Sequence, residues 1–62
     1  MRFVPPADIH TGTLVRIGRD YAPVVTVTRG TRSDAFTFEQ TPGMVQAPTL
    51  TIEHTRTVLI QD

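Results

Sequence analysis

Ser33 is the only serine in the chain and stands next to Asp34, while His10 and His54 are the candidate bases that would activate it. A serine nucleophile needs an adjacent base that is itself oriented by a third polar group. No spacing links either histidine to Ser33, and Ser-Asp pairs are common in turns for backbone hydrogen bonding alone. The remaining acidic residues are scattered and predict no paired carboxylates. We therefore expect no catalytic residues and a protein that is not an enzyme.

A metal site would need three or four converging ligands. Asp8 and His10 share one face of an extended segment, whereas Glu53 and His54 point to opposite faces of theirs. The chain has no Cys, which excludes disulfides, thiol chemistry and cysteine-based zinc sites. We expect no metal and no other cofactor.

Arginine supplies all six basic side chains, and Lys, Asn, Cys and Trp do not occur. Arg offers a rigid bidentate fork to carboxylates and phosphates, although codon bias in a GC-rich genome would give the same composition. The formal net charge is zero, which argues against the broad positive field of non-specific nucleic-acid binding. Residues 1–33 nevertheless carry a net charge of +3 and residues 34–62 a net charge of −3. Two molecules could attract each other head to tail.

The length of 62 residues predicts one domain of marginal stability, because so short a chain buries only roughly 60% of its unfolded surface. Without disulfides, a metal or association with other subunits is the usual source of additional stability. The apolar fraction of 39% is too high for a disordered tail, and no long apolar run predicts a membrane span. The start, MRFVPPADIH, lacks the continuous apolar core of a signal peptide. We expect a soluble protein of otherwise unknown localisation.

Strands are the elements that must position these side chains, because hydrophobicity alternates with a period of two from Gly12 onward. Residues 1–11 form an extended lead-in, since Pro5 and Pro6 disfavour helix, and residues 12–62 form the β domain. Residues 13–17 predict the first strand and residues 18–21 a tight turn, after which Pro23 opens the next strand.

The stretch VVTVTRGTRSDAFTFEQ, residues 24–40, predicts two strands around a turn at Arg29 and Gly30. Ser33 and Asp34 are assigned to the end of this turn. The alternation places Val and Phe inward and Thr outward. The inward residues are Val25, Val27, Phe36 and Phe38, and the outward residues are Val24, Thr26, Thr28, Ala35, Thr37 and Glu39.

Residues 41–48 contain two prolines and a glycine, which predict a loop with Met44 and Val45 at its tip. This apolar pair either makes a contact with a partner or folds back over the core. Residues 49–61 keep one strand phase throughout, but a single strand of that length would run about 43 Å and protrude from a domain with a radius of gyration of ~11 Å. We therefore favour a turn near His54 and Thr55. The alternative is one long strand that extends from the domain and reaches a neighbouring molecule.

About five short antiparallel strands result, and in a chain this small they form an SH3-like or OB-like barrel or a minimal sandwich. The run GTLVRIG, residues 12–18, resembles the opening strand of KOW and other SH3-like RNA-associated barrels. The resemblance covers these seven residues and ends where Ala22 and Pro23 replace a further glycine. It implies a small nucleic-acid-binding or regulatory module as the alternative function.

A structural or interaction subunit of a larger symmetric assembly is the function that this physical character favours. Phage virion accessory proteins, such as capsid decoration or cement proteins and connector or tail subunits, are the class we expect. The partner is another protein or a second copy of the chain, and no membrane is involved. The predicted contact residues are Phe3, Val4, Met44, Val45, Leu59, Arg29 and Arg32.

Overall fold

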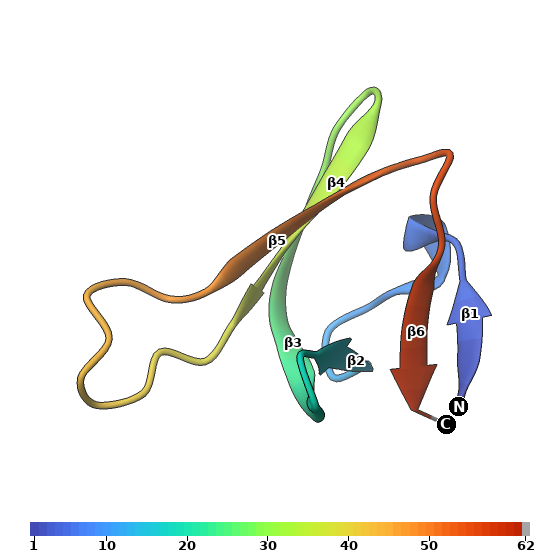
Figure 1. Ribbon diagram of the computed structural model, residues 1–62. Coiled ribbons are helices and arrows are strands. Elements are labelled where there is room, and N and C mark those ends of the chain that lie inside the picture. Colours follow the sequence, from blue (N-terminus) through green and yellow to red (C-terminus); the bar gives the residue numbers. More distant parts are fainter. Residues whose placement is uncertain (62) are drawn as a thin grey trace.

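A computed structural model describes residues 1–61. These residues form six strands and one 3-10 turn: β1 (Arg2–Val4), η1 (Pro6–Asp8), β2 (Leu14–Ile17), β3 (Asp20–Arg29), β4 (Ser33–Phe38), β5 (Thr49–Glu53) and β6 (Val58–Gln61). All pairings are antiparallel, and the order across the sheet is β1-β6-β2-β3-β4-β5 (Figure 1). The all-β prediction is confirmed, with six strands rather than five in one open sheet.

The segment predicted as an extended lead-in accounts for the additional strand. Its first residues form β1, in which Phe3 faces Leu59 of β6 in the register, and its two prolines lead into η1 instead of a continuous extended chain. Val4, Pro6 and Ile9 of this segment are buried, Ile9 completely. The segment is therefore part of the hydrophobic core rather than an appendage to it.

β3 joins the two halves of the sheet and is bent by a β-bulge. Its first residues pair with β2 and its later residues with β4. The register passes from Val24 opposite Phe38 to Thr26 opposite Thr37, so Val25 has no opposite residue. A bulge of this kind reverses the face parity on either side of the extra residue. The predicted phase is wrong here: Val24 is 2% exposed and Val25 is 48% exposed.

The core lies between the two halves of the sheet. Val24 and the two phenylalanines of β4 belong to one buried cluster with apolar residues of the N-terminal segment and of β6. The inward orientation predicted for Phe36 and Phe38 is confirmed, with exposures of 0% and 4%. The complete set of buried apolar residues is Val4, Ile9, Val15, Val24, Phe36, Phe38, Val58 and Ile60.

The last part of the chain turns at residues 54–55, as the length argument predicts, and the radius of gyration is 11.2 Å. The turn is fixed by backbone hydrogen bonds from His54 to Arg32 and from Arg56 to Glu53, at 2.8 and 2.9 Å. β5 pairs with β4, whereas β6 crosses to pair with β1 and β2. The corner therefore carries the chain from one half of the sheet to the other (Figure 1).

Residues 39–48, which we call the arm, project away from the sheet between β4 and β5 (Figure 1, left). Phe38 N donates to Pro48 O at 3.0 Å at its base, and Met44 N donates to Thr41 O at 3.1 Å near its tip. The Gln40 side chain donates to Met44 O at 2.9 Å. Val45 is 98% exposed, so the apolar tip does not fold back over the core.

Candidate functional site

Asp34 is the one charged residue among those buried in residues 1–61, with 3% of its surface exposed. The sequence interpretation placed it in a turn, but it lies in β4, in phase with Phe36 and Phe38. Alternate residues of a strand share a face, so the regular continuation of β4 toward the β3–β4 turn carries this carboxylate inward. A buried carboxylate is costly unless it is paired and hydrogen-bonded.

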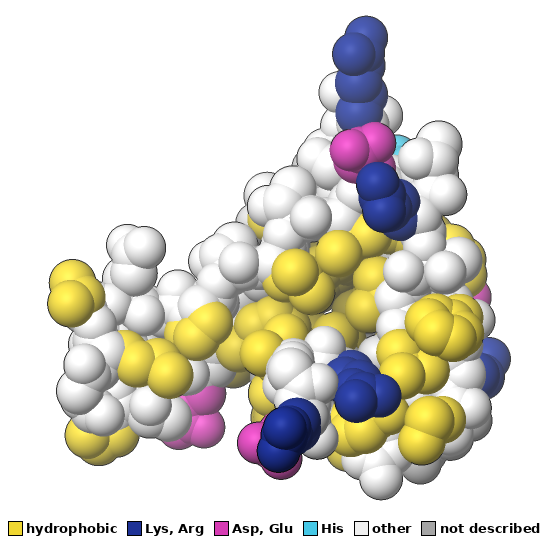
Figure 2. All heavy atoms as spheres, viewed as in Figure 1, with side chains coloured by type: hydrophobic (Ala, Val, Ile, Leu, Met, Phe, Trp, Pro, Cys, Tyr) yellow, Lys and Arg dark blue, Asp and Glu magenta, His cyan; other side chains and the backbone are white. Residues whose placement is uncertain are grey.

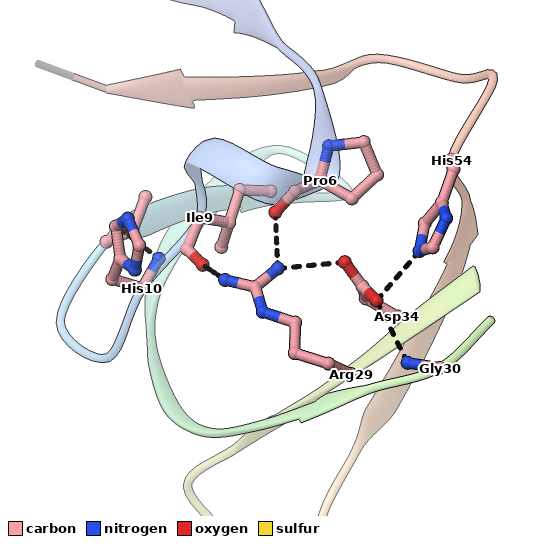
Figure 3. A network of polar contacts seen from close by, with 8 residues as sticks. Pro6, Ile9, His10, Arg29, Gly30, Asp34 and His54 are labelled. Atoms are coloured by element: carbon pink, nitrogen blue, oxygen red, sulfur yellow. Dashed lines mark hydrogen bonds and ion pairs between the residues drawn. The ribbon is translucent and has the colours of Figure 1, made fainter. Parts of the chain in front are cut away.

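Three donors surround the Asp34 carboxylate (Figure 3). Oδ1 accepts from Nε2 of His54 at 2.9 Å and from the Gly30 backbone at 3.1 Å, and Oδ2 accepts from Arg29 at 2.8 Å. The hydrogen bond from His54, followed by those from Arg29 and Gly30, lowers the pKa of Asp34 from 3.8 to about 2 against the opposing effect of burial. Asp34 is thus held as a carboxylate.

Arg29 extends this network to the N-terminal segment. One guanidinium nitrogen donates to Pro6 O at 2.8 Å as well as to Asp34, and the other donates to Ile9 O at 2.7 Å. The guanidinium carbon also lies 6.0 Å from the centroid of the Phe36 ring, within the range of a cation–π contact. We call Arg29, Asp34 and His54, with the backbone groups they bind, the Asp34 cluster.

The Asp34 cluster connects four segments from three regions that are distant in the sequence. Arg29 ends β3 and Gly30 follows it in the β3–β4 turn, Asp34 comes from β4, His54 from the corner before β6, and the two accepting carbonyls from η1 and its end (Figure 3). The side-chain contacts thus hold the N-terminal segment against the open side of the bent sheet. Their arrangement is that of a structural clamp.

A groove of about 450 Å³ borders the Asp34 cluster, with Pro5, Pro6 and Ala7 on its wall together with the cluster residues. His54 is 42% exposed there, but nucleophilic catalysis would need a hydroxyl on its far side. Ser33 follows the opposite strand phase to Asp34 and lies on the other face of β4. Among residues 1–61, no group of three or more acidic or histidine side chains could hold a metal ion.

His10, the other candidate base, takes no part in the cluster. Its backbone N–H donates to Oγ1 of Thr13 at 3.0 Å, and its side chain lies beyond Ile9, on the opposite side from His54 (Figure 3). The structure therefore does not bring the two histidines together.

The predicted contact residues are dispersed over the molecule. Phe3 is 69% exposed and faces Leu59, which is partly buried, across the β1–β6 pair. Val4 is buried in the core, and Arg29 belongs to the Asp34 cluster. The other three are exposed at two places. Arg32 lies in the β3–β4 turn, and Met44 and Val45 lie together at the tip of the arm.

A second groove, of about 410 Å³, runs between the arm and the β2–β3 hairpin. Its walls are largely apolar and include Tyr21, Phe38 and Met44, whereas Asp20 and Glu39 add two carboxylates. Figure 2 shows a notch between the projecting arm and the body, with acidic side chains on both sides of it. We call it the arm groove.

Neither the Asp34 cluster nor the arm groove was predicted. The cluster had a usable signal, because Asp34 precedes Phe36 and Phe38 at the same two-residue spacing. The sequence carries no comparable signal for the arm groove, because the groove depends on the position of the arm relative to the β2–β3 hairpin. Within the described residues, no helix is long and apolar enough to cross a membrane. The chain matches no protein-family profile, no curated protein and no solved structure.

Proposed function

We propose that the protein is a non-enzymatic structural subunit of a symmetric assembly and that it contacts its neighbour through the arm. The exposure of Val45, 98% at the tip of the arm, carries this proposal. Met44 beside it is 43% exposed, and Figure 2 shows hydrophobic side chains distributed over the arm. Clustered apolar groups on a projecting element are typical of protein–protein contact sites.

The arm has a defined conformation although none of its residues is buried. Fixing a residue costs roughly 1–2 kcal/mol of conformational entropy. The arm offsets part of this with Pro42, Pro48 and its internal hydrogen bonds. A preformed apolar loop loses less entropy on binding than a flexible one. These properties support a loop that is prepared for a partner surface.

The connectivity supports a specific architecture for this subunit, a partly open SH3-like barrel. β2 to β5 follow one another as a meander, β3 is bent and shared between both halves, and β6 returns to pair with β2 after a tight turn. The N-terminal segment occupies the remaining side. The virion accessory proteins named above are the class of assembly subunit to which we assign it.

Light scattering after size exclusion, at two protein concentrations and two ionic strengths, tests this function. We expect a molar mass above that of the monomer, increasing with concentration and decreasing only modestly as the salt concentration rises. Met44→Ser with Val45→Ser should reduce association at least tenfold without changing the circular dichroism spectrum. Val25→Ser is the matched control, because Val25 is also exposed but lies on β3. Equal association of all three proteins would refute the role of the arm.

Nucleic-acid binding is the second candidate, supported by the same strand order and by the resemblance of residues 12–18. The arginines argue against nucleic-acid binding, because two of them already have partners within the protein. Arg29 is engaged in the Asp34 cluster, and Arg16 donates to Gly18 O at 2.9 Å. An RNA or DNA oligomer included in the same experiment distinguishes the two functions. Binding by a monomer that weakens steeply as salt rises would favour this candidate.

A further inference from the structure

The β3–β4 hairpin carries opposite charges at its two ends. Arg32 is exposed in the turn that joins the strands, whereas Asp20 begins β3 and Glu39 follows β4 at the other end. Both carboxylates are exposed and line the arm groove. Figure 2 shows a basic side chain projecting at one extremity of the molecule, and acidic side chains with basic ones beside them around the notch at the other.

The arm groove has the chemistry of a receptor for an arginine. Tyr21, Phe38 and Pro48 provide apolar surface against which the aliphatic stem and the flat guanidinium can pack. Asp20 and Glu39 stand on the groove as acceptors for the charged end. The residues that line the groove include no basic side chain. Arg19, the basic residue next to Asp20 in the sequence, lies in the β2–β3 turn and is exposed.

Arg32 has the properties of the matching ligand. Its backbone carbonyl accepts from His54 N at 2.8 Å, which fixes the turn, while its side chain is exposed. It cannot reach the groove of its own molecule, because the ten residues of β3 separate the two sites by roughly 30 Å at ~3.3 Å per residue. Any pairing between them must therefore be intermolecular.

We propose that the arm groove receives the β3–β4 turn of a second copy of this chain, with Arg32 between Asp20 and Glu39. The inference rests on the proposed assembly function and gives it an interface. The contact is heterologous, because one molecule offers its turn and the other its groove, and such contacts build a ring when the rotation closes and a filament when it does not.

Charge reversal at the two sites tests the interface by light scattering at low salt. Arg32→Glu alone, and Asp20→Arg with Glu39→Arg, should each weaken self-association at least tenfold, since like charges then face each other. Mixing these two proteins should restore association, because each turn then finds a groove of opposite charge. One chain carrying all three substitutions should also self-associate. All three positions are exposed, and circular dichroism verifies that each variant is folded.

Arg19→Glu is the control, because it changes the net charge as Arg32→Glu does but adds negative charge near the groove. It should not weaken association. An equal loss with both substitutions would show a net-charge effect and overturn the interface, as would a failure of the mixture to associate. If charge reversals have no effect while the arm variant dissociates, the turn-in-groove contact is wrong and the proposed function stands. A wild type that remains monomeric at all concentrations and salts overturns this inference, whatever other partner the arm binds.

Discussion

The Asp34 cluster and the arm make opposite use of polar and apolar side chains. In the cluster a carboxylate is buried, and three donors surround it within 3.1 Å. In the arm an aliphatic side chain, Val45, is almost fully exposed, and the hydrogen bonds are those of the loop with itself. The first region joins four segments of the chain, while the second touches the body chiefly at its base.

This difference teaches where stability and binding reside in a very small protein. A buried polar network is costly unless every member is satisfied, and no buried side-chain nitrogen or oxygen in residues 1–61 lacks a hydrogen-bond partner. The cluster therefore supports the fold. The arm contributes little to the fold, so its sequence is available for a partner.

Deleting residues 1–10 should have the largest effect and abolish folding. The deletion removes Val4, Pro6 and Ile9 from the core, and a buried aliphatic side chain contributes about 1.5–3 kcal/mol. A domain of this size has a total stability of only ~3–9 kcal/mol. Circular dichroism should show the loss of the β spectrum. A cooperatively folded protein consisting of residues 11–62 would mean that the lead-in is dispensable.

Ile9→Ala should come next and destabilise the protein by about 2–5 kcal/mol, because Ile9 is completely buried and its truncation leaves a cavity. Val45→Ala, which removes a side chain of similar kind from the arm, should change the free energy of unfolding by less than about 0.5 kcal/mol. Urea denaturation of both variants measures the contrast. Similar losses would remove the distinction between the two regions.

Acid should destabilise the protein through Asp34. Its pKa is 3.8 when unperturbed and about 2 in the fold, so the unfolded chain binds more protons between these values. The stabilisation by the carboxylate is complete above pH 3.8 and is lost as the pH falls toward about 2. Urea midpoints from pH 2 to 6 should fall more steeply for the wild type than for Asp34→Asn. Asp20→Asn, at an exposed carboxylate, should leave this difference unchanged.

Alanine in place of two glycines, one in the turn of the cluster and one in the arm, compares the two regions again on a smaller scale. A Cβ on Gly30 would lie 2.5 Å from Ser33 O, so Gly30→Ala must shift the turn that donates to Asp34, at a cost of about 1–3 kcal/mol. Gly43, in the arm, has a φ of +95° and open space around it. Gly43→Ala strains a turn of the arm that can rearrange without disturbing the core, so it should lower global stability less than Gly30→Ala does. Thermal denaturation followed by circular dichroism ranks the two, and the reverse order would place the arm among the stabilising elements.

Much of the fold could be predicted because alternation is a local property. Phe36 and Phe38 follow a single phase, and the turn near His54 follows from the length of chain that a small domain can hold. Val24 and Val25 were assigned to the wrong faces, since both are apolar and the bulge at Val25 is set by pairing with β4. β1 was missed because a three-residue strand is defined by its distant partner, β6, and not by its own sequence.

The candidate sites were harder to predict for a related reason. Asp34 was assigned to a turn because Ser-Asp pairs are common there, and its partner His54 lies 20 residues away. Arg29 was expected at a partner surface, but its guanidinium is held by carbonyls of the N-terminal segment. Such contacts between distant segments leave no spacing in the sequence that would identify them.

The pairing of β1 with β6 has a consequence for how the chain reaches this structure. It brings Arg2 opposite Ile60, whereas the pairs β2–β3, β3–β4 and β4–β5 each join strands adjacent in sequence. Joining the extremities of the chain requires a large loop to close, and such steps are slower than forming hairpins. We therefore expect the meander to assemble early in refolding and the outer pair to dock late, with Phe36→Leu slowing folding and Val58→Ala mainly accelerating unfolding.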